Sequence, residues 1–279
     1  MIPPIASNFV AGESPATALD HVAARNAEGV NVILNLLGEH YEDPSAAAND
    51  TNAYRALAQD IADSDVDACI SVKPSQLGID AGDDVFESNF RTIVEAAQDV
   101  GVFVWCDMED ADTTDTTLDA FEELAREFEG GVGQCVQSNL KRTSDDLERL
   151  ADVPGKIRLV KGAYDESPEV SYKQKSKVNE RYRADLEALF ASYEGDIAVG
   201  SHDPQMIDYA KELREEYDRE FEIQMLMGVR GDAQRELAAE GEEVWQYAPY
   251  GDKWLSYFYR RIRERKENAL FAVRAILGV

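Results

Sequence analysis

A single closed (β/α)8 barrel of the TIM-like type, spanning residues 1–279, is the fold that this sequence predicts. Eight short apolar runs recur along the chain, and each precedes a polar stretch with helical periodicity. Apolar strands that alternate with helices indicate a parallel sheet covered on both faces. Eight such units in 279 residues favour a closed barrel over an open doubly wound sheet. No Gly-x-Gly-x-x-Gly motif follows the first run, which argues further against a dinucleotide-binding sheet.

The expected strands are the apolar runs themselves. Their near-continuous apolar character is typical of strands buried on both faces, whereas a half-exposed strand would alternate. In chain order the runs cover residues 30–37, 68–73, 102–108, 133–137, 157–161, 196–201, 221–227 and 243–248.

The stretches between these runs predict helices, because apolar residues recur in them at three- and four-residue spacing. Acidic residues early in two of them suit a helix N-terminus, and Thr, Ser and Asp near the starts of two others are plausible caps. In chain order the expected helices cover residues 43–63, 83–99, 116–128, 144–150, 169–192, 204–217, 231–241 and 253–277, and a further helix at 14–28 precedes the first strand.

The charge balance excludes some classes of partner. Acidic residues number 55 against 28 basic ones, which gives a net charge of -27. Nucleic-acid binding needs clustered Lys and Arg, so this composition argues against it, and equally against anionic membranes. We favour a protein tuned to high salt, in which the repulsion among carboxylates is screened, over a merely acidic one.

The cysteines and histidines suggest no metal or redox site. Cys69, Cys106 and Cys135 each lie in an apolar run, and their spacing matches no zinc or redox motif, so we expect buried thiols. The three histidines are scattered. No window approaches the length of a membrane span, and the N-terminal residues lack the pattern of a signal peptide, so we expect a cytoplasmic protein.

In this barrel type the active site lies at the C-terminal ends of the strands. Lys73 ends the second run, where a buried lysine can be a Schiff-base nucleophile or an anchor for an anionic substrate. The structural alternative is a salt bridge, for instance with Asp107 near the end of the third run. Two cations lie shortly before a glycine in Arg158-Leu159-Val160-Lys161-Gly162-Ala163-Tyr164, which suits a phosphate or the neutralisation of nearby acids.

The expected last helix carries the one dense basic run in the sequence, Tyr259-Arg260-Arg261-Ile262-Arg263-Glu264-Arg265-Lys266. Two adjacent guanidiniums can grip a small carboxylate in fixed bidentate geometry. Spacing alone fits a solvated helix face stabilised by pairs such as Arg260 with Glu264 equally well.

Taken together, these stretches resemble the proline dehydrogenase family in its stand-alone bacterial and archaeal form. The matching motifs run in order over nearly the whole chain. They are residues 9–13, 36–39, 71–78, 107–110, 158–164, 247–251 and 259–264, of which the segment beginning at Arg158 and the double arginine followed by glutamate are the most specific.

The resemblance implies a distorted barrel with non-covalent FAD at the strand ends and a final helix over the barrel mouth. It places Asp107 and Arg158 at family active-site positions. For L-proline it implies a pocket of Lys73, Arg260, Arg261, Tyr247, Tyr164 and Glu39, with Glu264 and Leu226 as weaker candidates. For the flavin it implies contacts from Met108, Gln137, Lys161, Gly162, Ala163, Ser201 and His202.

Two departures from the family pattern concern these contacts. Ser201-His202-Asp203 stands where the family often has Thr-His-Asn, which keeps the hydroxyl but adds a negative charge. Gln137-Ser138-Asn139 stands where an aromatic often follows the glutamine, so the contacts near that strand are expected to differ.

The resemblance also implies a set of partners. The chain lacks the aldehyde-dehydrogenase and DNA-binding parts of the fused bacterial proteins, so we expect it to make 1-pyrroline-5-carboxylate and to leave the next step to a separate pyrroline-5-carboxylate dehydrogenase. A quinone or another electron acceptor would reoxidise the flavin, with possible peripheral association at the inner face of the membrane. Two alternatives stay open: a Schiff-base lyase that uses Lys73, and a non-catalytic barrel that binds an amino acid.

Overall fold

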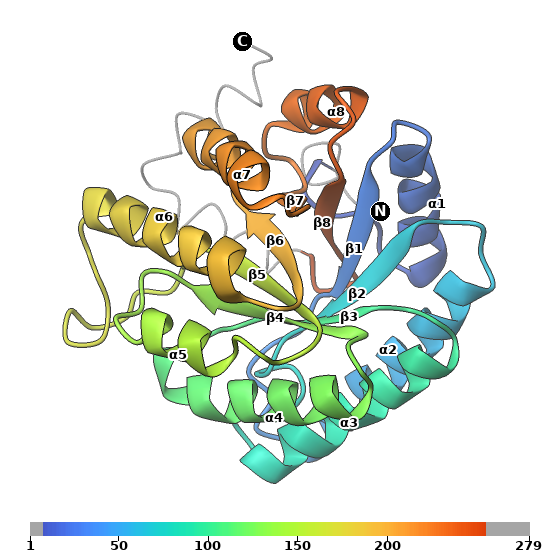
Figure 1. Cartoon of the computed structure of the whole chain (residues 1–279). Coiled ribbons are helices and arrows are strands. Elements are labelled where there is room, and N and C mark those ends of the chain that lie inside the picture. The colour runs from blue at the N-terminus through green and yellow to red at the C-terminus, as the bar shows by residue number, and fades with distance from the viewer. Residues whose placement is uncertain (1–7, 255–279) are drawn as a thin grey trace.

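A computed structural model describes residues 8–254, and in it eight parallel strands close into a barrel in the order β1 to β8 (Figure 1). Figure 1 shows the helices arranged around the outside of the strands. The predicted fold class is therefore confirmed for the part of the chain that the structure describes. The strands are β1 Asn31–Leu36, β2 Ala68–Val72, β3 Val104–Cys106, β4 Val132–Gln137, β5 Lys156–Val160, β6 Asp196–Gly200, β7 Glu222–Leu226 and β8 Val244–Tyr250.

Helices follow the strands as the apolar spacing predicts. Ser14 and Thr17 form a capping box at the start of α1, and the carboxylates of Asp43 and Asp203 accept hydrogen bonds from the first turns of α2 and α7. The helices are α1 Pro15–Asn26, α2 Pro44–Ala62, α3 Asp83–Asp99, α4 Thr114–Glu127, α5 Thr143–Arg149, α6 Lys175–Ser192, α7 Pro204–Tyr217 and α8 Gly231–Ala239, with a short 3-10 helix η2 at Ala111–Thr113.

Closure of the barrel depends on the pairing of β1 with β8. Six successive residue pairs, from Asn31 with Trp245 to Leu36 with Tyr250, hold these two strands in parallel register. The last strand runs through Pro249, which has no N–H to donate. β7 ends beside Tyr247, so no strand on that side needs a donor from Pro249, while the Pro249 carbonyl accepts from the N–H of Ala11 at 2.8 Å.

Alternate residues of each strand serve two different cores. Residues such as Val32, Leu34 and Ile70 face outward and pack with the helices in the main apolar core. The interior of the barrel holds a smaller cluster of Ile33, Cys69, Trp105 and Ala198, with Phe103, Trp245 and Tyr247 packed against it. All three cysteines are free and buried, as their apolar surroundings predict.

Most predicted boundaries differ from the structure by one or two residues, and the start of one helix differs by six. The third strand, expected at 102–108, covers only Val104–Cys106. The helix expected at 169–192 begins at Lys175, because the residues before it are tied to the β4–α5 loop by a bridge between Leu140 and Ser171. The eighth strand continues beyond the predicted residue 248 to Tyr250. The expected helix at 253–277 falls almost wholly outside the described residues. Within residues 8–254, no helix is long and apolar enough to cross a bilayer.

Candidate active site

Asp107 is the centre of a hydrogen-bonded cluster at the C-terminal end of β3. Its Oδ1 accepts from Ser71 Oγ at 2.8 Å and forms an ion pair with Nη2 of Arg158. Its Oδ2 accepts from the Tyr247 hydroxyl at 2.7 Å. Side chains from β2, β5 and β8 therefore converge on one carboxylate, as the strand-end argument predicts for Asp107, Arg158 and Tyr247.

The Arg158 guanidinium lies inside the barrel. Only 4% of the residue is exposed, and its guanidinium carbon lies 4.9 Å from the ring centroid of Trp105 and 5.7 Å from that of Tyr247. Burial alone would lower the pKa of Arg158, but its interactions with Cys135, Asp107 and Tyr247 outweigh burial and raise that pKa. A permanent positive charge is thus held at mid-barrel beside the strand ends.

The two candidate tyrosines remain protonated and act as donors. Burial and the charge of Asp107 raise the pKa of Tyr247 well above its ordinary value. Burial and Glu109 likewise raise the pKa of Tyr164, whose hydroxyl donates to Oε1 of Glu109 at 3.1 Å. Glu109 is buried and its Oε2 also accepts from the backbone N–H of Ser75 at 2.8 Å. One carboxylate therefore ties the loops after β2, β3 and β5 together.

Lys73, directly after β2, forms an ion pair with Glu39, which follows the adjacent strand β1. The ammonium lies 3.7 Å from Oε2 of Glu39, and 12% of the lysine side chain is exposed. The salt bridge with Asp107, the structural alternative for Lys73, is not formed, because Asp107 pairs with Arg158 instead. Lys73 and Glu39 are thus brought together on the β1 and β2 side of the mouth.

The segment after β5 makes a close turn over β4. Gly162 has a φ of +96°, and a Cβ there would lie 2.0 Å from Oδ1 of Asn139, so the backbone can approach this closely only at a glycine. Lys161 donates to Asn179 and Asp203, at 2.7 Å in each case. The Asp203 that departs from the family pattern is therefore neutralised by Lys161. Burial alone would raise the pKa of Asp203, but hydrogen bonds from Lys161 and Gln205 lower it.

The other predicted flavin positions also lie at strand ends. Gln137 Nε2 donates to the carbonyl of Glu109 at 2.8 Å, and Ser201 Oγ accepts from the N–H of Asp203 at 3.1 Å. Nε2 of His202 accepts from the N–H of Leu226 at 3.3 Å. Met108 is buried after β3, whereas Ala163 is exposed beyond β5. Arg260, Arg261 and Glu264, predicted to hold the substrate, lie outside the described residues.

Three polar residues of the cluster did not appear among the predicted site residues. Ser71 and Gln224 both contact Arg158, and Glu109 anchors Tyr164. Glu109 directly follows the predicted third strand, so its position was a usable signal. Ser71 and Gln224 are inside their strands, where only the register tells whether a side chain faces the barrel interior.

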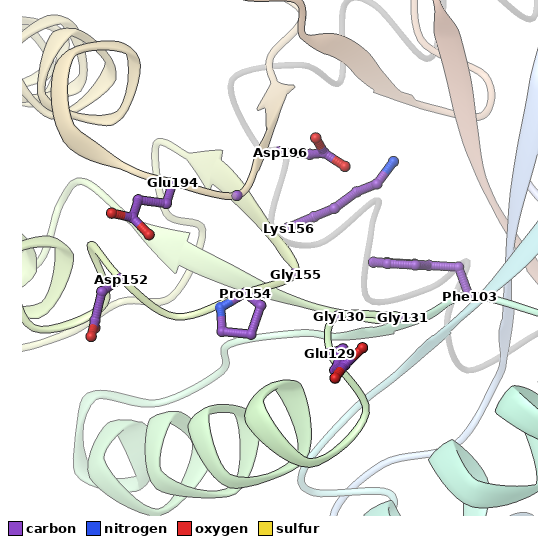
Figure 2. Close-up of a pocket in the computed structure, with 11 residues that line it drawn as sticks. Phe103, Glu129, Gly130, Gly131, Asp152, Pro154, Gly155, Lys156, Glu194 and Asp196 are labelled. Atoms are coloured by element: carbon purple, nitrogen blue, oxygen red, sulfur yellow. The ribbon is translucent and has the colours of Figure 1, made fainter.

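A hollow of about 360 Å³ lies at the opposite, N-terminal end of the barrel. Figure 2 shows Lys156, Asp196 and Phe103 at its wall, together with Asp152 and Glu194 from the loops that lead into β5 and β6. In (β/α)8 barrels this end serves stability and the C-terminal end serves chemistry. We therefore place the candidate active site at the Asp107 cluster and not in this hollow.

The fold and the strand-end cluster define a class: a (β/α)8-barrel enzyme whose chemical groups lie at the C-terminal ends of the strands. A family model described as Proline dehydrogenase matches residues 18–274. The chain is 37% identical over 280 residues to the proline dehydrogenase of Deinococcus radiodurans, covering 98% of this chain and 90% of that protein. It is 34% identical over 277 residues to Proline dehydrogenase 1 of Bacillus subtilis subsp. natto, with the same coverage. The chain belongs to the proline dehydrogenase family.

Solved structures show the same fold. Proline utilization A from Bdellovibrio bacteriovorus, in a crystal structure of the form inactivated by N-propargylglycine, matches with a TM-score of 0.85 at 23% identity. The match covers 95% of this chain, which spans 32% of that longer protein. The family and the curated relatives support proline oxidation as the reaction of this enzyme.

Proposed function

We propose that this chain binds FAD without a covalent bond and oxidises L-proline to 1-pyrroline-5-carboxylate, the first step of proline catabolism to glutamate. The observation that carries the proposal is the convergence of Asp107, Arg158 and Tyr247 in one hydrogen-bonded cluster at the strand ends. Family membership supplies the reaction class.

The residues around the mouth fit a flavin. Among the described residues, the buried Oδ1 of Asn139 and the buried hydroxyl oxygen of Ser75 have no hydrogen-bond partner, and they lie in the loops after β4 and β2. Polar atoms buried in this way call for a further partner. Lys161 has a third ammonium hydrogen beyond its two bonds, which suits a phosphate or a ring oxygen. We assign FAD contacts to Met108, Gln137, Lys161, Gly162, Ala163, Ser201 and His202.

Substrate binding is assigned to the cations of the mouth. Lys73, with Arg260 and Arg261, would hold the proline carboxylate and so reduce the entropic cost of aligning its ring. Glu39 would keep one of these cations in place, as it lies against Lys73. The rings of Tyr164 and Tyr247 would wall the pocket, with their hydroxyls held by Glu109 and Asp107.

The same groups account for the chemistry. The clustered cations favour the neutral amine of bound proline over the ammonium, because like charge disfavours protonation. A neutral nitrogen can donate electrons as the hydrogen at Cδ leaves, so no dedicated base is needed. FAD, when bound, supplies the two-electron acceptor that takes this hydride at N5. Arg158, held by Asp107 but still cationic, would stabilise negative charge that develops beside it.

The test is a visible absorption spectrum of the purified protein in concentrated salt, before and after anaerobic addition of L-proline. Flavin bands that bleach on addition support both the cofactor and the substrate. Bands that persist would contradict the substrate, and the absence of bands after reconstitution with FAD would contradict the cofactor. D-proline, added in place of L-proline, is a matched control, because it carries the same carboxylate on a ring of opposite configuration.

A second test addresses the carboxylate clamp. Arg261→Lys should raise KM for proline strongly, because one ammonium cannot reproduce a bidentate guanidinium. An unchanged KM would contradict this assignment.

We further propose the setting of the reaction. Residues 1–279 would form a single catalytic domain. This domain would be cytoplasmic, either free or in peripheral contact with the inner face of the membrane. A quinone or another electron acceptor would reoxidise the flavin, and a separate pyrroline-5-carboxylate dehydrogenase would consume the product. The net charge of -27 supports a halophilic protein.

A further inference from the structure

A line of polar side chains runs through the barrel interior, from the active-site end to the opposite opening. It consists of Arg158 and Lys156 on β5 and of Gln224 and Glu222 on β7. Nη1 of Arg158 donates to Oε1 of Gln224 at 3.1 Å. Nε2 of Gln224 donates to Oε1 of Glu222 at 2.5 Å, and Nζ of Lys156 donates to Oε2 of Glu222 at 2.8 Å.

The chemistry of these groups fixes the direction of the Gln224 amide. An ionised carboxylate only accepts hydrogen bonds, so Glu222 turns the NH₂ group of Gln224 toward itself. The amide oxygen must then point to Arg158, which only donates. A reversed amide would set two donors against each other at Arg158 and two acceptors against each other at Glu222.

Glu222 is in turn held by Lys156. Glu222 is only 4% exposed, and burial raises the pKa of its carboxyl, while the Lys156 ammonium opposes that shift. The charge of Glu222 helps to raise the pKa of Lys156, which lines the hollow in Figure 2 together with Asp196. A buried ion pair is often no more stabilising than apolar residues of similar volume. Stability alone therefore does not explain the pair of Glu222 and Lys156 inside the barrel.

Several side chains contact Arg158, and Gln224 supplies the contact on the side of the N-terminal barrel opening. Trp105 and Tyr247 lie against the guanidinium, while Asp107 binds Nη2 at the active-site end. The hydrogen bond from Nη1 to Gln224, on the side of the N-terminal barrel opening, fixes the rotation of the guanidinium about its long axis. The position of the charge at the active site therefore depends on residues at the other end of the barrel.

We propose that Glu222 and Gln224 are positioning residues that hold Arg158 for the reaction, with Lys156 keeping Glu222 in place. This inference rests on the proposed function, because it takes Arg158 as a group that acts on the reacting atoms. Neither Glu222 nor Gln224 needs to touch the flavin or the substrate. Their loss should slow the redox step and leave the binding of the proline carboxylate nearly unchanged.

The test uses three variants of the FAD-loaded enzyme in concentrated salt. Gln224→Met keeps the volume but removes the acceptor for Arg158, and Glu222→Met removes the group that orients Gln224. The double variant E222Q/Q224E exchanges the amide and the carboxylate between the two positions. The carboxylate at position 224 then accepts from Arg158. The amide at position 222 donates its NH₂ group to that carboxylate, and its oxygen accepts from Lys156. The exchange keeps the net charge and rebuilds every hydrogen bond of the line.

A matched control is Glu242→Met on the outside of the barrel. Glu242 is also nearly buried and paired with two cations, at 3.1 Å from Lys211 and 2.9 Å from Arg214. Its loss removes a comparable ion pair without touching the barrel interior. General destabilisation would therefore appear in Glu242→Met as well.

Stopped-flow reduction of the flavin at saturating L-proline is the main measurement. We expect Q224M and E222M to slow it by about tenfold, while KM changes by less than about twofold and both E222Q/Q224E and E242M stay within about twofold of the parent. A parent-like rate for Q224M, or a double variant as slow as Q224M, would overturn the proposal.

A crystal structure of Q224M without flavin supplies a readout that does not depend on activity. We expect the Arg158 guanidinium to turn away from position 224, and an unmoved guanidinium would also overturn the inference. If proline fails to bleach the flavin of the parent protein, the proposed function fails instead. The position of Arg158 in the crystal then still decides whether Gln224 orients it.

Discussion

The hydroxyl of Tyr247, on the last strand of the barrel, donates to Oδ2 of Asp107, at the end of β3, over 2.7 Å. Asp107 thereby joins a neutral donor on one oxygen to a buried cation, Arg158, on the other. Loss of the Tyr247 hydroxyl and loss of the Asp107 carboxylate should have different consequences. A missing tyrosine hydroxyl leaves Asp107 paired, whereas a missing carboxylate leaves a buried charge without its counter-ion.

Asp107→Asn should therefore destabilise the protein far more than Tyr247→Phe. Breaking a buried ion pair on one side costs about 3 kcal/mol, whereas removing one hydrogen bond costs about 1 kcal/mol. Urea unfolding at constant high salt measures both, since urea adds no ions. Equal losses for the two variants would contradict the central position of the ion pair with Arg158.

Gly162→Ala should weaken FAD binding and lower the melting temperature. The residue has a φ of +96°, and the new Cβ would meet Asn139 Oδ1 at 2.0 Å, so either the Asn139 side chain or the turn itself must shift. Gly101→Ala is the matched control, because Gly101 also has a positive φ of +75° but has nothing within 4 Å of the added Cβ. The left-handed conformation costs an alanine about 1 kcal/mol at either position.

FAD titration followed by flavin fluorescence separates these two effects. We expect weaker FAD binding for Gly162→Ala alone, together with a larger loss of melting temperature than for Gly101→Ala. The same FAD affinity in both variants would remove Gly162 from the flavin site.

Much of the fold was predictable because burial on both faces leaves a signal in the sequence itself. The bounds of α3, Asp83–Asp99, and α7, Pro204–Tyr217, agree with the spacing of their apolar residues and the acidic or proline residues at their starts. The start of α6 was not predictable in this way. Leu140 and Ser171 pair across two loops, and such a tertiary contact overrides local periodicity.

Some residues of the candidate site were likewise predictable from the sequence, and others were not. Lys73 and Asp107 were predictable because each is a charged residue at or next to the end of an apolar run. Gln224 and Glu222 were not predictable, because the sequence of a strand does not show whether a polar side chain within it faces the barrel interior or a helix. Parallel register places Glu222 beside Ala198 and Gln224 beside Trp245, and these pairings turn both side chains inward.

Asp203→Asn restores the residue that the family often has, and we expect it to lose a small, pH-dependent stability. Asn caps a helix about as well as Asp, so the cap on α7 should survive while the ion pair with Lys161 is lost. The pair is partly exposed, so the loss should stay below about 1 kcal/mol.

The sign of the pH dependence follows from the lowered pKa of Asp203. A group with a lower pKa in the folded state stabilises the fold above its unfolded pKa, near 3.8 here, and the contribution disappears as the pH falls through the folded value. Unfolding free energies of parent and variant should differ at neutral pH, begin to approach each other near the unfolded pKa of 3.8, and converge once the pH is below the lowered pKa of Asp203. A difference that persists at low pH would show that the cap, and not the ion pair, carries the effect.

Removal of salt should lower the melting temperature steeply. The net charge is -27, and repulsion among exposed carboxylates grows as the Debye length increases from about 3 Å at 1 M salt to about 30 Å at 0.01 M salt. Calorimetry over a series of KCl concentrations measures this, with sucrose of equal osmolality as the control for excluded-solute effects. A melting temperature that does not change with KCl would contradict a halophilic protein.

Lys73→Met distinguishes a substrate anchor from a covalent nucleophile. As an anchor, Lys73 contributes charge to the proline carboxylate, so its loss should raise KM by at least about tenfold while FAD stays bound. A nucleophile would instead form a Schiff base that borohydride traps as a stable adduct. We expect no mass increase when the parent protein is treated with borohydride and a keto acid. An adduct present in the parent and absent in Lys73→Met would assign the mouth of this barrel to lyase chemistry.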